Sequence, residues 1–161
     1  YFFRGRRRGL AMGCAALSMS TIGVQAMTDD PTRLAPCPQS PNCVCSDEDP
    51  NSSQYIAPFI SQMSGATPDT ADAQRLLAAI AAYLESRSEF RIVRQDNNSL
   101  QIEARSRLLR FVDDIEMRVR GNGVVVRSAS RVGYSDLGKN RRRLESIRQA
   151  MITQGLVRSD N

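Results

Sequence analysis

The chain contains no histidine, the side chain that most often serves as a general base and binds zinc. It also has no G-x-S-x-G nucleophile elbow, no P-loop and no glycine-rich dinucleotide turn. None of its four cysteines forms a C-x-x-C pair. The chain therefore lacks the usual sequence signatures of hydrolases, nucleotide-binding enzymes and thiol oxidoreductases. We expect no cofactor.

Long hydrophobic runs are also missing, and the longest apolar stretch lies near the start of the chain. Residues 1–26 combine four arginines, an apolar core at residues 10–24 and a small-residue cleavage site. Serines and a threonine interrupt the core, which is shorter than the roughly 20 apolar residues of a membrane span. We therefore interpret residues 1–26 as a signal peptide and expect a periplasmic or secreted protein. The alternative is an anchor in the inner membrane, with membrane association through residues 10–24.

Three cysteines follow the predicted leader, inside a segment rich in proline, serine and asparagine at residues 27–66. Export favours a disulfide, and a Cys37–Cys43 bridge would close a short loop around two prolines. Cys45 would then be free, and Cys45→Ser would leave stability nearly unchanged. A thiol redox role or metal binding by the three cysteines remains the alternative, although C-x5-C-x-C offers only three ligands and we expect no metal.

The remainder, residues 67–161, has the periodicity of a helix, four strands and a second helix. Apolar residues recur at helical spacing after Thr67-Pro68 and again after Asp136, which we interpret as the N-cap of the second helix. Alternating patterns predict the strands 89–94, 100–106, 114–120 and 124–131. We predict an α+β fold: a two-layer sandwich with a four-stranded antiparallel sheet, two helices on one face, and residues 27–66 as a preceding Cys/Pro-rich arm.

A hairpin at Gly121-Asn122-Gly123 joins the last two predicted strands. A two-residue turn at Asn122-Gly123 pairs Asp114 with Arg131 and Glu116 with Ala129. Alternation then places one set of charged side chains on the sheet face away from the core, namely Asp114, Glu116, Arg118, Arg127 and Arg131.

Charge is unevenly distributed along the chain. Residues 127–148 carry seven cations and two acids, whereas residues 27–148 as a whole are nearly balanced, which argues against nucleic-acid binding. The chain has 21 arginines and one lysine, a bias that suits bidentate recognition of carboxylate or phosphate. Cations in the first helical turn oppose the helix dipole by ~0.3–1 kcal/mol each. Either internal acids compensate for Lys139 and Arg141 to Arg143, or the helix entrance receives an anion.

These observations predict a site where the last strand meets the last helix. We expect a non-catalytic protein that binds an acidic small molecule, a lipid headgroup or an envelope partner there. The expected binding residues are Arg127, Ser130, Arg131, Tyr134, Asp136 and Asn140. The alternatives are a hydrolase-like enzyme that uses the carboxylates of Asp114 and Glu116, and a purely structural network of ion pairs.

Three segments carry a family resemblance: APCPQSPNCVCS at 35–46, SRLLRFVDDIEMRV at 106–119 and RSASRVGYSDLGKNRRR at 127–143. They resemble, in order, the signature blocks of the family catalogued as domain of unknown function 1499. The resemblance implies a domain covering about residues 34–161 in an exported or membrane-associated bacterial-type protein, with relatives in plastids, and no established activity. Cys45 stands where the family usually has serine, and Lys139 where it usually has an apolar residue.

Overall fold

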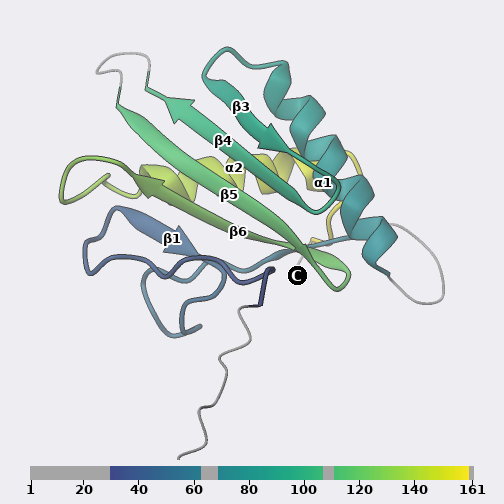
Figure 1. Ribbon diagram of the computed structural model, residues 1–161, viewed down its shortest axis with the longest axis horizontal. Coiled ribbons are helices and arrows are strands. Elements are labelled where there is room, and N and C mark those ends of the chain that lie inside the picture. Colours follow the sequence, from purple (N-terminus) through teal and green to yellow (C-terminus); the bar gives the residue numbers. More distant parts are fainter. Residues whose placement is uncertain (1–29, 63–68, 107–110, 160–161) are drawn as a thin grey trace, which may run out of the picture.

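The computed structural model describes residues 30–62, 69–106 and 111–159, which form an α+β fold with two helices and a mostly antiparallel sheet (Figure 1). The elements are β1 (Cys43–Cys45), β2 (Phe59–Ile60), α1 (Thr70–Glu85), β3 (Phe90–Gln95), β4 (Ser99–Arg105), β5 (Val112–Arg120), β6 (Gly123–Ser130) and α2 (Lys139–Thr153). The expected leader at 1–26 lies outside the described residues. Within the described ranges, no helix has the length and apolarity of a membrane span.

The sheet has six strands, so the predicted count of four was too low. Its order is β1-β6-β5-β4-β3, and β2 pairs separately with β6. The two additional strands come from the Cys/Pro-rich arm and contain three and two residues, which is too short for an alternating pattern to be recognisable. Close approach of β2 requires the glycine at position 123, where an added Cβ would lie 3.0 Å from the carbonyl oxygen of Phe59.

The β5–β6 hairpin turns one residue earlier than predicted. Arg120 pairs with Gly123, so the turn is Gly121-Asn122, and Gly121 adopts the left-handed conformation with φ of 58°. The predicted pairings were therefore wrong: Asp114 lies opposite Ala129, and Glu116 lies opposite Arg127. A slip of two residues along the partner strand preserves the alternation, so each side chain stays on its predicted face.

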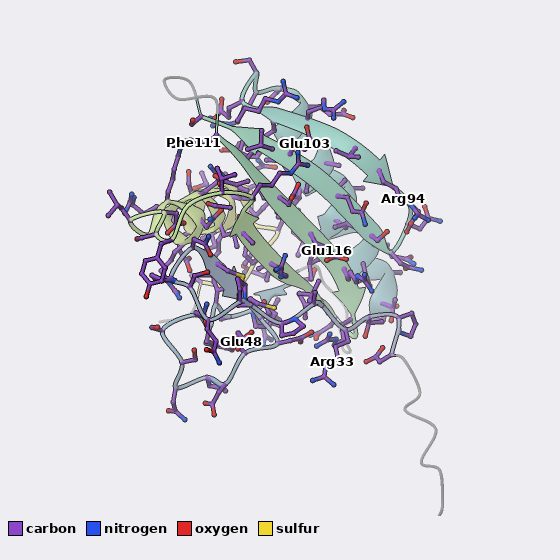
Figure 2. The ribbon with its side chains drawn as sticks, turned by 60° about the vertical axis from the view of Figure 1, so that its left-hand side comes forward. Arg33, Glu48, Arg94, Glu103, Phe111 and Glu116 are labelled. Atoms are coloured by element: carbon purple, nitrogen blue, oxygen red, sulfur yellow. A yellow bond between two sulfur atoms is a disulfide. The ribbon has the colours of Figure 1, made fainter. Side chains whose placement is uncertain are left out.

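One hydrophobic core joins the helices to the sheet. Leu76 and Ile80 of α1 and Leu144 of α2 are fully buried in the same cluster as Ile115 and Val126. We call this side of the sheet the core face. The opposite side, which carries Glu103 and Glu116 (Figure 2), is the outer face.

The entrance of α2 differs from the prediction. Leu137 and Gly138 both have positive φ, at 55° and 74°, so the helix begins at Lys139. Asp136 is not the N-cap residue, yet its carboxylate accepts hydrogen bonds from the backbone N–H groups of Gly138 at 2.9 Å and Asn140 at 2.6 Å. A tight loop precedes the helix and brings this carboxylate back over the first turn.

The arm is attached to the outer face beside β6. Leu34 and Cys45 are buried with Val125 in a second small core. The predicted disulfide between Cys37 and Cys43 is confirmed, with sulfur atoms 2.04 Å apart. Cys45 is free and buried.

Candidate functional site

A buried polar cluster lies on the core face where β5, β6 and the start of α2 meet. The Asn140 side chain donates to the backbone carbonyl of Asn42 at 3.0 Å and to the Ser130 hydroxyl at 3.1 Å. Ser130 in turn donates to Asp113 at 2.6 Å, and Arg143 donates to Asp113 at 2.6 Å and to Asn140 at 2.9 Å. Partners from separate parts of the chain therefore orient the guanidinium of Arg143.

This cluster draws on all three of the sequence segments 35–46, 106–119 and 127–143. Asp113 and Asn140 are almost completely buried, and each has its hydrogen-bonding oxygen atoms occupied. A satisfied buried network of this kind favours one arrangement of the elements that it connects. Of the expected binding residues, Asn140 is thus buried and Ser130 is partly buried, and both make contacts within the fold.

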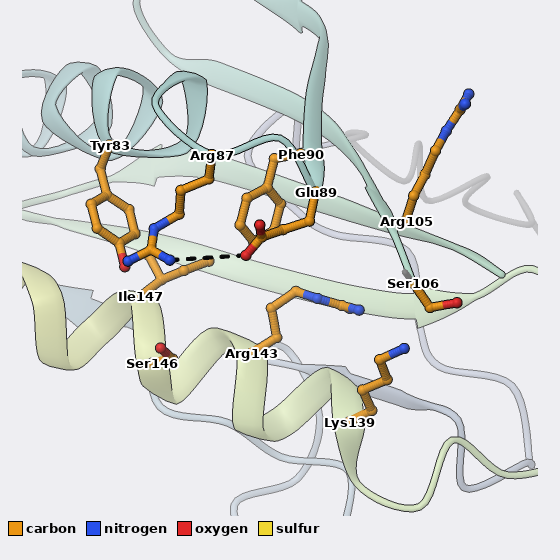
Figure 3. A pocket seen from close by; sticks show the side chains of 10 residues that line it. All are labelled: Tyr83, Arg87, Glu89, Phe90, Arg105, Ser106, Lys139, Arg143, Ser146 and Ile147. Carbon is orange, nitrogen blue, oxygen red and sulfur yellow. Dashed lines mark ion pairs between the residues drawn. The ribbon is translucent and has the colours of Figure 1, made fainter. Parts of the chain in front are cut away.

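Beside the cluster is an open cavity of about 280 Å³, which we call the cationic cleft (Figure 3). It lies between the end of α1, the start of β3, the end of β4 and the first turns of α2. Its lining residues are Tyr83, Arg87, Glu89, Phe90, Arg105, Ser106, Lys139, Arg143, Ser146 and Ile147. Four cations and one carboxylate therefore line the same cavity, but Arg105 pairs with Glu103 at 3.4 Å, so three cations remain for a ligand.

The cations of the cleft differ in how they are held. Arg143 is only 11% exposed and is paired with the buried Asp113. Lys139, one helical turn earlier, extends beside it toward Ser106 in Figure 3, and its side chain has no hydrogen bond or ion pair among the described residues. Arg87 stacks over the ring of Tyr83, 4.5 Å from its centre, and its ion pair with Glu89 is long at 3.9 Å. Most N–H donors of these three cations are therefore available inside the cleft.

Other arginines near the helix entrance bind the backbone of their own fold. Arg141 donates to the carbonyl oxygens of Ser53 and Tyr55 at 2.8 and 2.6 Å, and Arg142 donates to that of Leu137 at 2.8 Å. These contacts attach α2 to the arm and to its preceding loop. They account for two of the four cations that oppose the helix dipole, and the Arg143–Asp113 ion pair accounts for a third.

The backbone N–H groups at the start of α2, where the sequence predicted an anion site, are mostly occupied by the loop before the helix. The N–H groups of Gly138 and Asn140 already donate to Asp136. Tyr134 is 75% exposed and lines none of the cavities described here. The sequence grouped Tyr134, Asp136 and Asn140 with Arg127 and Arg131, but the sheet separates the buried Asn140 from the two arginines.

Arg127 and Arg131 lie on the outer face with the carboxylates. Arg131 donates to both oxygens of Asp114, at 2.9 and 2.7 Å, and to Glu103 at 2.8 Å. Hydrogen bonds from Arg131 and Arg91 lower the pKa of Glu103 to about 2. The pairing of Asp114 with Arg131 that the sequence predicted is present even though the two residues are not directly opposite. Arg131 is engaged by protein acids, whereas the side chain of Arg127 has no hydrogen bond or ion pair among the described residues.

The carboxylates expected for catalysis are also engaged. Both oxygens of Asp114 accept from Arg131, and Oε1 of Glu116 accepts from Arg118 at 2.8 Å. A general base needs a lone pair directed at the substrate, and these arrangements direct them at arginines. The described residues contain no group of three or more potential metal ligands.

The thiol alternative likewise lacks a reactive group. Burial raises the pKa of the Cys45 thiol, and its sulfur faces the carbonyl of Ala35 at 3.8 Å. A neutral, enclosed thiol is a poor nucleophile.

Sequence reasoning missed the cleft for identifiable reasons. Alternation along β5 puts Asp113 on the core face, and a carboxylate on that face is itself a sign of a buried partner. The partner is Arg143, thirty residues away, which no local pattern reveals. Arg87 and Glu89 lie in the loop between α1 and β3, whose proximity to α2 depends on the tertiary fold.

Comparison with known proteins shows which family the chain belongs to. The family model described as Protein of unknown function (DUF1499) matches residues 33–151. The chain belongs to this family. Neither a curated protein nor a solved structure matches it. Membership in DUF1499 confirms the resemblance of the three segments and assigns no reaction to the site.

Proposed function

We propose that this member of the DUF1499 family binds a small acidic molecule in the cationic cleft and does not transform it. The observation that carries the proposal is the oriented guanidinium of Arg143, held by the buried Asp113 and Asn140 at the wall of an open cavity. Lys139 and Arg87 add positive charge from the same helix and from the opposite wall. A guanidinium that is held in place before binding loses less entropy when it meets an anion.

The lining of the cleft indicates the chemistry of the ligand. Donors outnumber acceptors, because three cations and the hydroxyls of Ser106 and Ser146 face a single carboxylate, Glu89. Phe90 and Ile147 provide apolar walls. The volume of about 280 Å³ is just below the ~300–1,000 Å³ of ordinary ligand sites, so the ligand must be small. A carboxylate or phosphate attached to a short apolar group suits this cavity.

We also propose that the protein acts outside the cytoplasm. The Cys37–Cys43 disulfide supports this location, since disulfides persist mainly in oxidising compartments. The basic and apolar composition of residues 1–26 supports export as well.

The test is a calorimetric titration of the full chain with benzoate, phenyl phosphate and inorganic phosphate. Lys139→Gln and Arg87→Gln should each weaken binding of the best probe about tenfold, because a hydrogen bond to a charged group contributes ~1.5–3 kcal/mol. Arg143 is left unchanged, since its loss would strand the buried Asp113.

Arg142→Gln is the matched control. It removes one positive charge from the same helix, but the Arg142 side chain binds the carbonyl of Leu137 and lies outside the cleft. Its affinity should equal that of the unmodified protein. An equal loss in all three variants would show a nonspecific charge effect and contradict the proposed site, as would wild-type affinity in Lys139→Gln and Arg87→Gln.

A further inference from the structure

Arg127 is the unexplained charge of the outer face. It lies in the middle of β6, opposite Glu116 of β5 on one side and Cys45 of β1 on the other. Its Nε atom is buried and has no hydrogen-bond partner. Buried polar groups in native proteins are almost always paired, so this one requires an explanation.

The acidic neighbours of Arg127 are committed to other arginines. Oε1 of Glu116 accepts from Arg118, and both oxygens of Asp114 accept from Arg131. On the other side, burial raises the pKa of the Cys45 thiol, so no thiolate is formed there to pair with the guanidinium. Among the described residues, Nε of Arg127 therefore has no acceptor, and Oε2 of Glu116, on the neighbouring strand, is also without a partner.

Arg127 opens onto a hollow of about 270 Å³ on the outer face. The other charged residues that line it are Glu103, Asp114, Glu116 and Arg131. A second hollow of about 580 Å³ shares Gln101 and Glu116 with the first, so the two are adjacent on the outer face, the second nearer the hairpin, and we call them together the groove. Figure 2 shows Glu103 and Glu116 on this face.

The charge balance of the groove defines its ligand. Three carboxylates and two guanidinium groups line the first hollow, and the second adds Asp96 and three arginines, Arg94, Arg118 and Arg120. The two hollows together thus carry both signs of charge in nearly equal number, in contrast to the cationic cleft, and suit a ligand with one charge of each sign better than a polyanion. A ligand carboxylate can pair with Arg127, and a ligand ammonium can pair with Oε2 of Glu116, which has no partner among the described residues.

We propose that this groove is a second binding site, specific for a small zwitterion such as an amino acid or a short peptide. Its carboxylate binds Arg127 and its ammonium faces Glu116, while the rest of the molecule extends toward the second hollow. This inference goes beyond the proposed function, because the site, the charge of the ligand and the residues all differ from those of the cleft.

The experiment titrates the full chain with dialanine, and with citrate as the polyanionic comparison. Dialanine should bind the unmodified protein more tightly than citrate does at this site. Arg127→Met, which keeps an unbranched apolar stem, should weaken dialanine binding at least about tenfold. Lys139→Gln and Arg33→Gln should leave it unchanged. Arg33 is an exposed arginine of the arm with no side-chain hydrogen bond or ion pair among the described residues, so it reports on general charge.

Thermal unfolding without ligand provides an independent readout. If Arg127 is unpaired in the free protein, Arg127→Met removes an unsatisfied buried donor and should raise Tm by about 3 °C. A lower Tm that is matched by Glu116→Gln and not additive with it would show that Arg127 pairs with Glu116, and would overturn the proposal. Wild-type affinity for dialanine in Arg127→Met would overturn it as well, as would loss of dialanine binding in Lys139→Gln, since that would place the ligand in the cleft.

Discussion

Arginines that lie close together in this sequence have different kinds of partner in the structure. Arg141 binds two backbone carbonyls of the arm, Arg143 binds a buried carboxylate, and Arg131 binds two acids of the outer face. A planar guanidinium presents five donors in a rigid fork that can pair bidentately with a carboxylate, whereas a lysine presents three donors on a flexible stem. The single lysine, Lys139, has no such partner among the described residues and faces the cleft. Residue type alone therefore does not separate a structural cation from one that is available to a ligand.

Leu137 provides a prediction at the same scale. Its φ of 55° is in the left-handed region, and its side chain is 82% exposed, so packing does not compensate for the strained backbone. Left-handed backbone costs a residue with a Cβ atom ~1–2 kcal/mol, and the greater flexibility of an unfolded glycine offsets ~0.5–1 kcal/mol of this. Leu137→Gly should raise the free energy of unfolding by ~0.5–1 kcal/mol in a urea titration.

Leu137→Ala is the control, because alanine keeps the Cβ atom and removes only the exposed side chain. It should be about as stable as the unmodified protein, to within ~0.5 kcal/mol. If alanine and glycine stabilise equally, the exposed side chain, not the backbone conformation, is the source of the effect.

At the scale of elements, long periodic segments were predictable and short ones were not. The stripe that includes Leu77, Ile80 and Leu84 and the alternation of Ile115 and Met117 predicted α1 and β5. Two- and three-residue strands give no period, so the sequence did not show that the arm completes the sheet. The predicted hairpin register was wrong because Gly121-Asn122-Gly123 contains two possible two-residue turns. Which of the two forms depends on how the whole strands pair, and the structure has the turn at Gly121-Asn122.

The candidate site was predictable in part. Alternation grouped Asp114, Glu116, Arg127 and Arg131 on one face, because that grouping depends only on the period of a strand. It could not show which face of α2 carries Lys139 and Arg143 toward β4, because helix rotation is set by packing. The residues after Ser130 were placed with Arg127 because they are close in sequence, whereas the chain there passes from the sheet to the helix.

Packing of the arm changes the expectation for Cys45. The sequence predicted that Cys45→Ser would have almost no effect, but the residue is fully buried between Leu34 and Val125. Exchanging a buried thiol for a more polar hydroxyl should lower the free energy of unfolding by ~1–3 kcal/mol. Urea unfolding under non-reducing conditions, with the Cys37–Cys43 disulfide intact, measures the change.

Cys45→Val separates packing from thiol chemistry. Valine keeps the position apolar at a similar volume, so its effect should stay below ~1.5 kcal/mol. Destabilisation by valine as large as that by serine would mean that the sulfur itself is required, and that the apolar explanation is wrong.

The whole molecule presents two differently charged surfaces on one sheet. The core-face end between the helices gathers four cations and one acid, whereas the first hollow of the outer face holds three acids and two arginines. Residues 27–148 have nearly equal numbers of cations and acids, yet the two kinds of charge gather on different surfaces of the molecule. Charge counts along the sequence show this segregation only in part. The two proposed sites call for ligands of different charge, so they can be tested independently on one protein.

The outer-face network also makes the stability of the molecule depend on pH. Glu103 accepts from Arg91 of β3 and Arg131 at the end of β6, and these hydrogen bonds lower its pKa from the ordinary 4.5 to about 2. The ionised form is thus favoured in the folded state, so the stabilisation is complete above pH 4.5 and is lost progressively as the pH falls from 4.5 to 2.

Glu103→Gln should therefore have a lower Tm than the unmodified protein at neutral pH, and the two Tm values should converge as the pH falls to about 2. Glutamine keeps the shape of the side chain but has no charge to lose, so the variant should show a flatter dependence of Tm on pH below 4.5. Glu85→Gln, at the exposed end of α1, should stay parallel to the unmodified protein across the titration. A constant gap in Tm between Glu103→Gln and the unmodified protein from neutral pH down to 2 would show that the carboxylate is not stabilised by its arginines, and that the acid sensitivity of the fold arises elsewhere.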